Sequence, residues 1–355
     1  MNELKLGMVG CGEISHTHAR AAAEISGIRF TACCDPDDRK SRLWGERYGC
    51  GKTYATLEEM LEQEALDGIV LATWPNLHRD QIGIALDRGI RHILCEKALC
   101  LTGEEALGIH RLARNYGATV LEACKNRYHP QFKRIRALAR SGEFGRVDHI
   151  QATFSNNEEE KRKTDAPMNW RIRKECGGGV PYDWVSYLVN AANSIAPSLP
   201  VRAAASGTLD PVSGVMDRLY GIIEYRGGMV AGISSSHHAS FSQELEIVCE
   251  KGRIYSPVNW GIFGDTVITL RRRQPDWPYL TEERLPVVHE DSFRNQMAHF
   301  AEVIRGRERP EIPLAESVVN ALTIEALVHA AESGASREIR IPDFLNPYPS
   351  PESGA

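Results

Sequence analysis

The chain has 355 residues, of which 42% are hydrophobic and 25% are charged, and its formal net charge is -5 at pH 7. This composition predicts a soluble chain with room for two domains that each bury a sizeable core. A mildly acidic chain without a long basic run is not expected to bind nucleic acid or an anionic membrane surface, which leaves a small molecule as the main partner.

Neither export nor membrane insertion is expected from the sequence. The first residues lack a charged segment followed by an apolar one, and no uncharged apolar stretch reaches about 18 residues. Nine cysteines are scattered along the chain without a Cys-x-x-Cys pair. This pattern predicts free thiols in a reducing compartment, and hence a cytoplasmic protein without a metal site.

A glycine-rich turn follows the first predicted strand. Residues 4–9 lead into Gly10-Cys11-Gly12-Glu13-Ile14-Ser15, and a helix is predicted over residues 14–25. The turn is close to the dinucleotide-binding fingerprint, in which glycines permit a tight turn and a close approach of the pyrophosphate. Ser15 replaces the third glycine, and a small residue there still lets the helix pack on the strand. We therefore predict a nucleotide-binding Rossmann unit.

The second predicted strand, residues 28–34, ends at Asp35. This position lies roughly 20 residues past the glycines, where a carboxylate binds the ribose hydroxyls of NAD and repels the 2'-phosphate of NADP. Arg39 and Lys40 follow closely and could reach such a phosphate if the Asp35 side chain turned away. The sequence predicts NAD, with NADP possible.

The first 125 residues alternate apolar runs with amphipathic segments, as a parallel sheet with crossover helices does. Further strands are predicted at residues 68–72, 92–95 and 118–123, and further helices at 38–48, 56–63, 77–88 and 103–116. Ligands of open α/β sheets bind beyond the carboxyl ends of the strands. The candidate ligand-binding stretches therefore follow the strands predicted at residues 68–72, 92–95 and 118–123. They are residues 73–78, 96–98 and 125–128.

The pattern changes after a basic helix predicted at residues 131–140. Runs rich in β-branched residues follow with few helices between them, which predicts a mainly antiparallel sheet. These strands are expected at residues 147–154, 201–208, 218–225, 228–235, 245–249 and 266–271, and helices at 183–196, 293–305 and 314–333. We predict a first domain over residues 1–125, a second over 126–341 and an unstructured tail over 342–355.

Several motifs in register give the sequence a family resemblance. They are Gly10-Cys11-Gly12, Asp35, Glu96-Lys97, Trp170-Arg171, Gly177-Gly178-Gly179, Asp183 and Phe293-x-x-Gln296-x-x-x-Phe300. From about residue 4 to 340 the chain resembles the Gfo/Idh/MocA oxidoreductases. The resemblance implies an α/β protein: an N-terminal Rossmann domain with a doubly wound parallel sheet, and a C-terminal α/β domain with an open, mostly antiparallel sheet. It also implies a nicotinamide cofactor between the domains and homodimers or homotetramers.

The same resemblance implies NAD(P)-dependent hydride transfer to or from a secondary alcohol or ketone of a sugar, cyclitol or sugar derivative. The catalytic residues it implies are Lys97, Asp183 and Tyr187. With the fingerprint, it implies cofactor contacts from Gly10, Gly12, Glu13, Ile14, Asp35, Thr73, Trp74, Asn76, His78, Glu96, Lys97 and Asn126. It implies substrate contacts from Lys97, Arg127, Trp170, Arg171, Asp183, Tyr187 and His238.

Two departures from the family pattern leave alternatives open. Ala98 replaces the proline of the Glu-Lys-Pro motif, and Tyr187 stands where many members have histidine. Asp183 and Tyr187 are four residues apart and so share a helix face. A tyrosine titrates near pH 10, and a nearby Lys97 ammonium would lower its pKa, so we interpret Tyr187 as the substitute acid/base rather than a packing residue. The alternative functions are a non-catalytic nucleotide-bound sensor or regulator, and an oxidoreductase that recycles a tightly bound cofactor.

Overall fold

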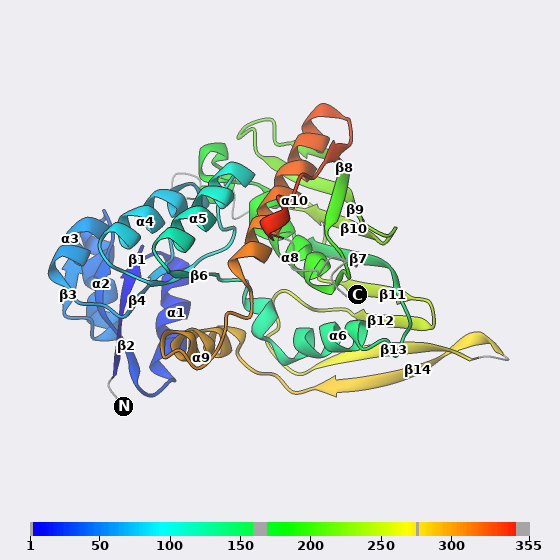
Figure 1. Ribbon diagram of the computed structural model, residues 1–355, viewed down its shortest axis with the longest axis horizontal. Helices are drawn as coiled ribbons and strands as arrows, with labels where there is room; N and C mark the ends of the chain where they lie inside the picture. Colours follow the sequence, from blue (N-terminus) through cyan, green and yellow to red (C-terminus); the bar gives the residue numbers. More distant parts are fainter. Residues whose placement is uncertain (1–2, 159–168, 275–276, 346–355) are drawn as a thin grey trace, which may run out of the picture. The chain divides into compact units, whose positions relative to one another are not determined.

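The computed structural model describes residues 3–158, 169–274 and 277–345. The chain forms two compact units (Figure 1). The first unit combines Met1–Tyr128 with Asp291–Ser317, and the second combines His129–Glu290 with Val318–Ala355. The predicted boundary at residue 125 lies close to the first of these divisions, whereas the segment 291–317, which the sequence boundaries assign to the second domain, belongs to the first unit.

The first unit is built on a six-stranded parallel sheet, which confirms the predicted doubly wound fold. Its order is β3-β2-β1-β4-β5-β6, so the chain reverses direction across the sheet between β1 and β4. Ligands of such folds bind outside the carboxyl ends of the strands at this point. The strands are β1 Leu4–Val9, β2 Ile28–Cys34, β3 Lys52–Tyr54, β4 Gly68–Leu71, β5 His92–Cys95 and β6 Thr119–Glu122.

Helices flank this sheet (Figure 1), and apolar side chains of the sheet and the helices are buried together in one core. They are α1 Glu13–Ala23, α2 Asp38–Tyr48, α3 Leu57–Gln63, α4 Pro75–Asp87 and α5 Gly103–Asn115. Helix α9, Ser292–Ile304, joins them from late in the sequence: its Met297 and Phe300 are completely buried in the same core as Leu6 and Met8. Burial of this apolar face explains why the segment belongs to the first unit.

The second unit is built on a nine-stranded sheet in the order β14-β13-β12-β11-β7-β10-β9-β8-β15. Only the β7/β10 pair is parallel among its described neighbours, which confirms the mostly antiparallel prediction. The strands are β7 Val147–Ser155, β8 Pro200–Leu209, β9 Met216–Tyr225, β10 Val230–Ser236, β11 Leu245–Cys249, β12 Gly252–Ser256, β13 Thr266–Gln274, β14 Trp277–Val287 and β15 Arg337–Glu338.

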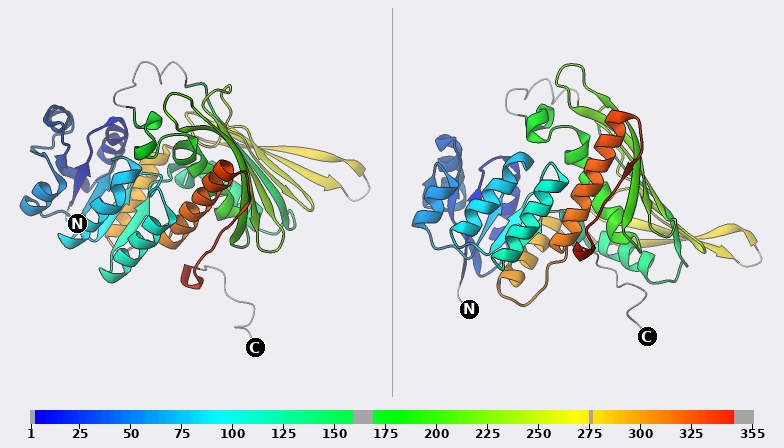
Figure 2. Two further views of the ribbon diagram at one scale, coloured as in Figure 1. Left: turned by 90° about the horizontal axis from the view of Figure 1, so that it is seen from above. Right: turned by 45° about the horizontal axis from the view of Figure 1, so that its top comes forward.

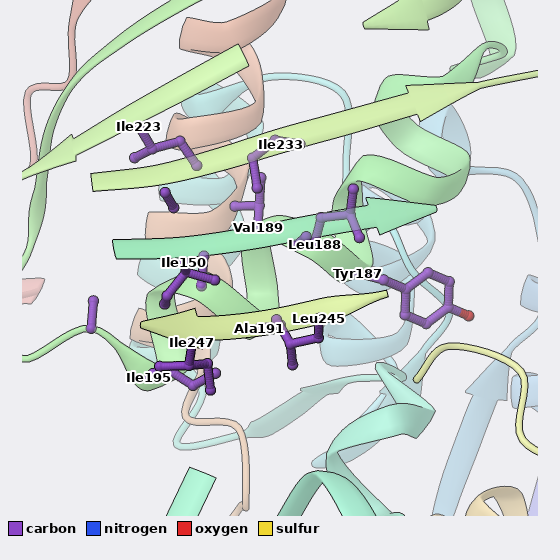
Figure 3. Close-up of a cluster of buried hydrophobic side chains, with 14 of the residues drawn as sticks. Ile150, Tyr187, Leu188, Val189, Ala191, Ile195, Ile223, Ile233, Leu245 and Ile247 are labelled. Carbon is purple, nitrogen blue, oxygen red and sulfur yellow. The ribbon is translucent and has the colours of Figure 1, made fainter. Parts of the chain in front are cut away.

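Helices α6 Pro130–Arg140, α8 Ser186–Ile195 and α10 Leu314–Ser333 contribute to the core on one face of this sheet (Figure 2). Strand β9 shows the alternation that such a sheet requires. Its Leu219 and Ile223 are completely buried, while Tyr220 and Ile222 are 53% and 51% exposed on the opposite face. Figure 3 shows the inner face, where isoleucines of four strands meet Leu188 and Val189 of α8.

Helix α10 is long and apolar enough by composition to cross a membrane, yet 56% of that stretch is buried inside the protein. Leu327 lies in the core of the second unit, and Asn193 donates a hydrogen bond of 2.8 Å to Asn320. We interpret α10 as a core helix. Of the predicted unstructured tail, residues 343–345 form a short turn with Leu345 buried, and residues 346–355 lie outside the described residues.

Candidate functional site

The glycine turn after β1 has the geometry that a nucleotide site requires. Gly10 has a φ of 85°, and a Cβ there would lie 2.9 Å from Thr73 Cγ2 and 3.0 Å from the Ala72 carbonyl oxygen, so only glycine fits. Gly12 is the N-cap of α1, and no atom lies within 4 Å of the Cβ that it lacks. The buried Ser15 hydroxyl donates to the Gly12 carbonyl oxygen. The N-terminus of α1 therefore opens on free space, as pyrophosphate binding needs.

Asp35 folds back onto this turn. One of its carboxylate oxygens accepts from the Cys11 amide at 2.8 Å, and the other accepts from the Asp37 amide at 2.9 Å. The carboxylate is thus fixed beside the glycines, 8% exposed, while Arg39 is exposed at the start of α2 and Lys40 is half-buried. The NAD prediction depends on Asp35, and the NADP alternative depends on Arg39 and Lys40. All three residues lie shortly after the end of β2.

The loop of residues 96–99, which we call the Lys97 loop, leaves β5 and is held from two sides by buried side chains. Glu96 accepts from His18 Nε2 at 2.7 Å and from the Lys97 amide at 3.2 Å. The Leu99 amide donates to Glu122 Oε1 at 3.1 Å. Burial raises the pKa of the Glu122 carboxyl to about 7. The backbone on both sides of Lys97 is therefore fixed by a carboxylate.

His78 completes the support of the same loop. Its Nδ1 lies 3.1 Å from the Ala98 carbonyl oxygen and 3.2 Å from that of Leu99, and its Nε2 lies 3.2 Å from the Thr73 carbonyl oxygen. Burial lowers the pKa of the His78 imidazole. The Lys97–Ala98 peptide bond is cis. His78 thus joins the loops after β4 and β5 rather than presenting a nitrogen to solvent.

Asn126 and Arg127 follow β6 in a 3-10 turn over Lys125–Tyr128. Asn126 is buried, and neither atom of its amide group has a hydrogen-bond partner within the described chain. Arg127 is completely buried and paired with Glu316 and, at 3.3 Å, with Glu311. The Arg127 guanidinium is thus held by two carboxylates of the first unit. These ion pairs do not support the predicted contact of Arg127 with substrate, which stays a prediction.

The first unit fits a dinucleotide. Gly12 leaves a space in front of α1, and the buried Oδ1 of Asn76, like the amide of Asn126, has no protein partner among the described residues. Such orphaned buried groups are rare unless a ligand satisfies them. The other predicted cofactor residues stand at the same strand ends: Glu13 and Ile14 in the first turn of α1, and Trp74 as the N-cap of α4.

In the second unit, three glycines let two turns pack tightly. A Cβ on Gly178 would lie 2.7 Å from the Trp170 carbonyl oxygen, and one on Gly179, whose φ is 96°, would lie 2.5 Å from the Met216 carbonyl oxygen. The Gly179 amide donates to the Arg171 carbonyl oxygen at 2.9 Å. Glycine is therefore required for the turn that carries Trp170 and Arg171 to reach the start of the following helix.

Asp183 and Arg171, both predicted site residues, form an ion pair in which Arg171 Nε lies 2.6 Å from Asp183 Oδ2. The Asp183 side chain is 2% exposed and that of Arg171 is 41% exposed. A single α-helix over residues 183–196 was predicted, but Pro181–Val185 forms a π-helical turn and α8 begins at Ser186. Such turns are frequent at functional sites.

Tyr187 ends an aromatic cluster of the second unit. The Trp184 and Phe154 rings are stacked with centroids 4.9 Å apart, and the Tyr187 ring lies 6.1 Å from that of Phe154. Figure 3 shows Tyr187 at the end of the apolar row, with its hydroxyl pointing away from the other labelled side chains. Tyr187 is 8% exposed and packs through its ring, while its hydroxyl points away from the apolar row, so packing and a chemical role are compatible.

The two adjacent histidines face different partners. His237 is buried with its ring edge-on to Trp184, at 4.5 Å between centroids. His238 Nε2 donates to Asp217 at 2.7 Å, and Asp217 also accepts from Thr208 at 2.8 Å. Of the pair, His237 contacts the aromatic cluster, whereas the predicted substrate residue His238 is oriented by a buried carboxylate.

Comparison with known proteins agrees with this arrangement. Residues 4–123 match the oxidoreductase family with an NAD-binding Rossmann fold, and residues 132–255 match the Gfo/Idh/MocA C-terminal domain. The chain belongs to the Gfo/Idh/MocA oxidoreductase family. It is accordingly an NAD(P)-dependent oxidoreductase with an NAD-binding Rossmann fold.

Two curated relatives align along most of their length. The chain is 28% identical over 336 residues to D-xylose 1-dehydrogenase (NADP(+)) 2 of Haloferax volcanii, spanning 95% of this chain and 100% of that protein. It is 21% identical to myo-inositol 2-dehydrogenase of Thermotoga maritima, over 87% of this chain and 90% of that protein. The aldose-aldose oxidoreductase of Caulobacter crescentus, solved with glycerol, has the same fold, with a TM-score of 0.82 at 20% identity over 95% and 100% of the two chains.

Sequence reasoning missed several residues that the structure brings to these sites. Glu122 supports the Lys97 loop, Asp217 orients His238, and Phe154 stacks on Trp184. Lys125 lies in the candidate stretch 125–128 after the fifth predicted strand, but it was not among the predicted site residues. Glu122 could have been found, because it is an acidic residue at the end of an apolar strand. The other residues gave no such signal in the sequence, because their partners come from distant parts of the chain.

Proposed function

We propose that the protein transfers a hydride between nicotinamide and a secondary alcohol or ketone of a sugar, cyclitol or sugar derivative. The observation that carries this proposal is the Lys97 loop, whose backbone is fixed by Glu96, Glu122 and His78 at the carboxyl edge of the parallel sheet. A lysine on so rigid a loop is suited to hold a hydroxyl and to stabilise negative charge on its oxygen. The names of the xylose and inositol dehydrogenases among the relatives support the substrate class.

In this proposal NAD(P), when bound, supplies the hydride acceptor or donor, and the chain supplies proton transfer and orientation. The Lys97 ammonium donates hydrogen bonds to the reacting oxygen and stabilises its negative charge as the proton leaves. In oxidation Tyr187 takes that proton as a phenolate, and in reduction its hydroxyl returns the proton to the reacting oxygen. Asp183, held by Arg171, accepts hydrogen bonds from neighbouring hydroxyls.

The aromatic cluster of the second unit supports a sugar-like substrate. Phe154, Trp184 and Tyr187 pack together, with Trp184 and Tyr187 7% and 8% exposed, and Trp184 directly follows Asp183 of the charged pair in the chain. Sugars and cyclitols have apolar C–H faces and polar hydroxyl rims, so rings and charged side chains side by side suit both.

The experiment that tests this function begins with protein purified without added cofactor. Its nicotinamide content and its absorbance near 340 nm are measured, and NAD or NADP is then added with a panel of sugars and cyclitols. We expect one group of substrates to reduce the added cofactor and Lys97→Ala and Tyr187→Phe to abolish this. Lys133→Ala and Tyr116→Phe, which change the same residue types elsewhere on the chain, are the matched controls.

The two alternatives give different results in the same experiment. Nicotinamide that co-purifies and turns over only when a second substrate is present indicates recycling of a tightly bound cofactor. Cofactor binding without turnover in either direction, unaffected by Lys97→Ala, indicates a sensor and contradicts the proposal.

We also propose that the protein assembles as a homodimer or homotetramer. Support comes from the helix-free face of the large sheet within the described residues, where Tyr220, Ile222 and Val230 are exposed on adjacent strands. Exposed apolar side chains on neighbouring strands of one sheet face favour association. Light scattering should give a multiple of the chain mass, which Ile222→Glu should reduce. A monomer at micromolar concentration would contradict the proposal.

A cytoplasmic location is likewise proposed. It is supported by the nine cysteines, all of which are buried free thiols. Fractionation of the native host should place the protein with cytoplasmic markers, and recovery in an oxidising compartment would contradict this.

A further inference from the structure

Lys125 lies next to Lys97 in the first unit because the two follow neighbouring strands. Strands β5 and β6 are parallel and pair Cys95 with Glu122, and the Ala123 amide donates to the Cys95 carbonyl oxygen at 2.7 Å. Each lysine stands a few residues past the end of its strand. Both lysines therefore stand at the carboxyl edge of the sheet, close enough for the Lys97 charge to act on Lys125.

The surroundings of Lys125 do not neutralise it. Its Nζ lies 4.8 Å from the centre of the Phe293 ring, and within the described chain the ammonium forms no ion pair. Burial and the Lys97 charge lower the pKa of Lys125, while Glu96 and Asp291 oppose them. These are the charged groups that face it.

Both of the opposing carboxylates are already engaged. Glu96 binds His18 and the Lys97 amide, and Asp291 caps α9 by accepting from the amides of Phe293 and Arg294 at 2.8 and 3.3 Å. A half-buried ammonium without its own counter-ion is unfavourable unless a ligand supplies the negative charge. Groups of this kind occur preferentially at functional sites.

The position in the sheet separates this charge from the cofactor phosphates. The pyrophosphate site is the glycine turn after β1, and the order β1-β4-β5-β6 places β6 three strands away. Strands are about 4.8 Å apart, so the two strand ends are separated by about 14 Å. An anion bound by Lys125 lies instead beside Lys97, the residue proposed to hold the reacting hydroxyl.

We propose that Lys125 binds a carboxylate of the substrate, so that the preferred substrate is a sugar acid or similar polyhydroxy acid rather than a neutral sugar. This inference rests on the proposed function. It narrows the substrate class to polyhydroxy acids and assigns substrate binding to the Lys125 ammonium.

The test compares neutral sugars with their acids: D-glucose with D-glucuronate, and D-galactose with D-galacturonate. We expect kcat/KM of the wild-type protein to be higher for the acid of the better pair. Lys125→Met should lower that value about 10- to 100-fold, mainly through KM, because an ionic hydrogen bond is lost. Lys125→Arg should restore part of it, and the exposed Lys133→Met is the matched control.

Binding gives a second readout that does not depend on turnover. Calorimetric titration of NADH-loaded protein with the preferred acid should show binding that Lys125→Met abolishes, with the affinity for NADH unchanged. Equal loss of NADH affinity would place the ammonium on the cofactor and overturn the inference. An unaltered preference between acid and neutral sugar in a folded Lys125→Met or Lys125→Gln variant would overturn it as well.

Failure of the inference is distinguishable from failure of the proposed function. Turnover of neutral sugars alone, with Lys125→Met as active as the wild type, overturns the assignment of a sugar acid and leaves the dehydrogenase function standing. Absence of turnover with every neutral sugar, cyclitol and acid contradicts the proposed function, and absence of acid binding in that case overturns the inference too.

Discussion

Replacing Glu122 by glutamine should change how the stability of the protein depends on pH. Glu122 is 3% exposed, and burial raises its pKa from 4.5 to about 7, with the nearby Glu316 and Glu96 adding to the effect. The Leu99 amide and the Ser317 side chain act in the opposite direction but do not outweigh burial.

The sign follows from proton binding. A raised carboxyl pKa means that the folded state holds a proton that the unfolded chain has already lost between pH 4.5 and about 7. The free energy of unfolding therefore falls as the pH rises through this window, and the full loss is present above pH 7. A shift of about 2.5 pKa units corresponds to about 3 kcal/mol.

Glutamine removes this titration and keeps the acceptor for the Leu99 amide. We expect the difference in unfolding free energy between Glu122→Gln and the wild type to increase by about 3 kcal/mol, in favour of the variant, between about pH 4.5 and pH 8. Urea unfolding curves at several pH values measure this difference, with the exposed Glu46→Gln as the control. Parallel pH profiles of Glu122→Gln and the wild type would refute the reasoning.

Three more substitutions test other parts of the account. Asp35→Ser should raise the ratio of kcat/KM for NADP over NAD about tenfold, because a charge that repels the 2'-phosphate is removed, and an unchanged ratio in steady-state assays would count against this. Arg127→Met should lower the free energy of unfolding by about 3 kcal/mol, since it leaves Glu311 and Glu316 without their buried partner, and a wild-type urea midpoint would contradict it. Gly179→Ala should cost about 2 kcal/mol or more, because the new Cβ would lie 2.5 Å from the Met216 carbonyl oxygen, whereas Gly214→Ala, with a similar positive φ but open space, should cost less in the same thermal scans.

Much of the first unit could be predicted because its signals are local. The strands Leu4–Val9, Ile28–Cys34 and His92–Cys95 and the helix Asp38–Tyr48 have the bounds expected from apolar runs and caps. Strand Lys52–Tyr54 was missed, since three residues are too few to show alternation. The position of α9 depends on contacts with the start of the chain. The Arg305 side chain, for example, donates to the carbonyl oxygen of Gly27, which lies 278 residues earlier. A local sequence pattern cannot predict such contacts.

The second unit was harder for the same reason. Strands Gly252–Ser256 and Trp277–Val287 were not predicted, because charged and polar residues interrupt their apolar pattern on the exposed face of the sheet. The π-helical turn at Pro181–Val185 has no periodicity distinct from the helix that follows it.

Part of the candidate site could be predicted from local sequence, and part of it could not. The positions of Gly10, Gly12 and Asp35 follow from the spacing of one motif, and the structure places all three at the same strand ends. The support of Lys97 by Glu122 could not be inferred, because it depends on two loops that meet only when β5 and β6 pair.

The most direct test of the central claim is a rapid-mixing measurement of the rate of NADH formation at about 340 nm in the wild type and in Lys97→Met, with the dissociation constant of NAD measured on the same samples. We expect the rate to fall about 10²- to 10³-fold in the variant, as the loss of a fixed donor that stabilises charge on the reacting oxygen predicts, while the dissociation constant stays within about twofold. A variant that binds NAD normally and forms NADH at the wild-type rate would contradict the assignment of Lys97 to the reacting hydroxyl.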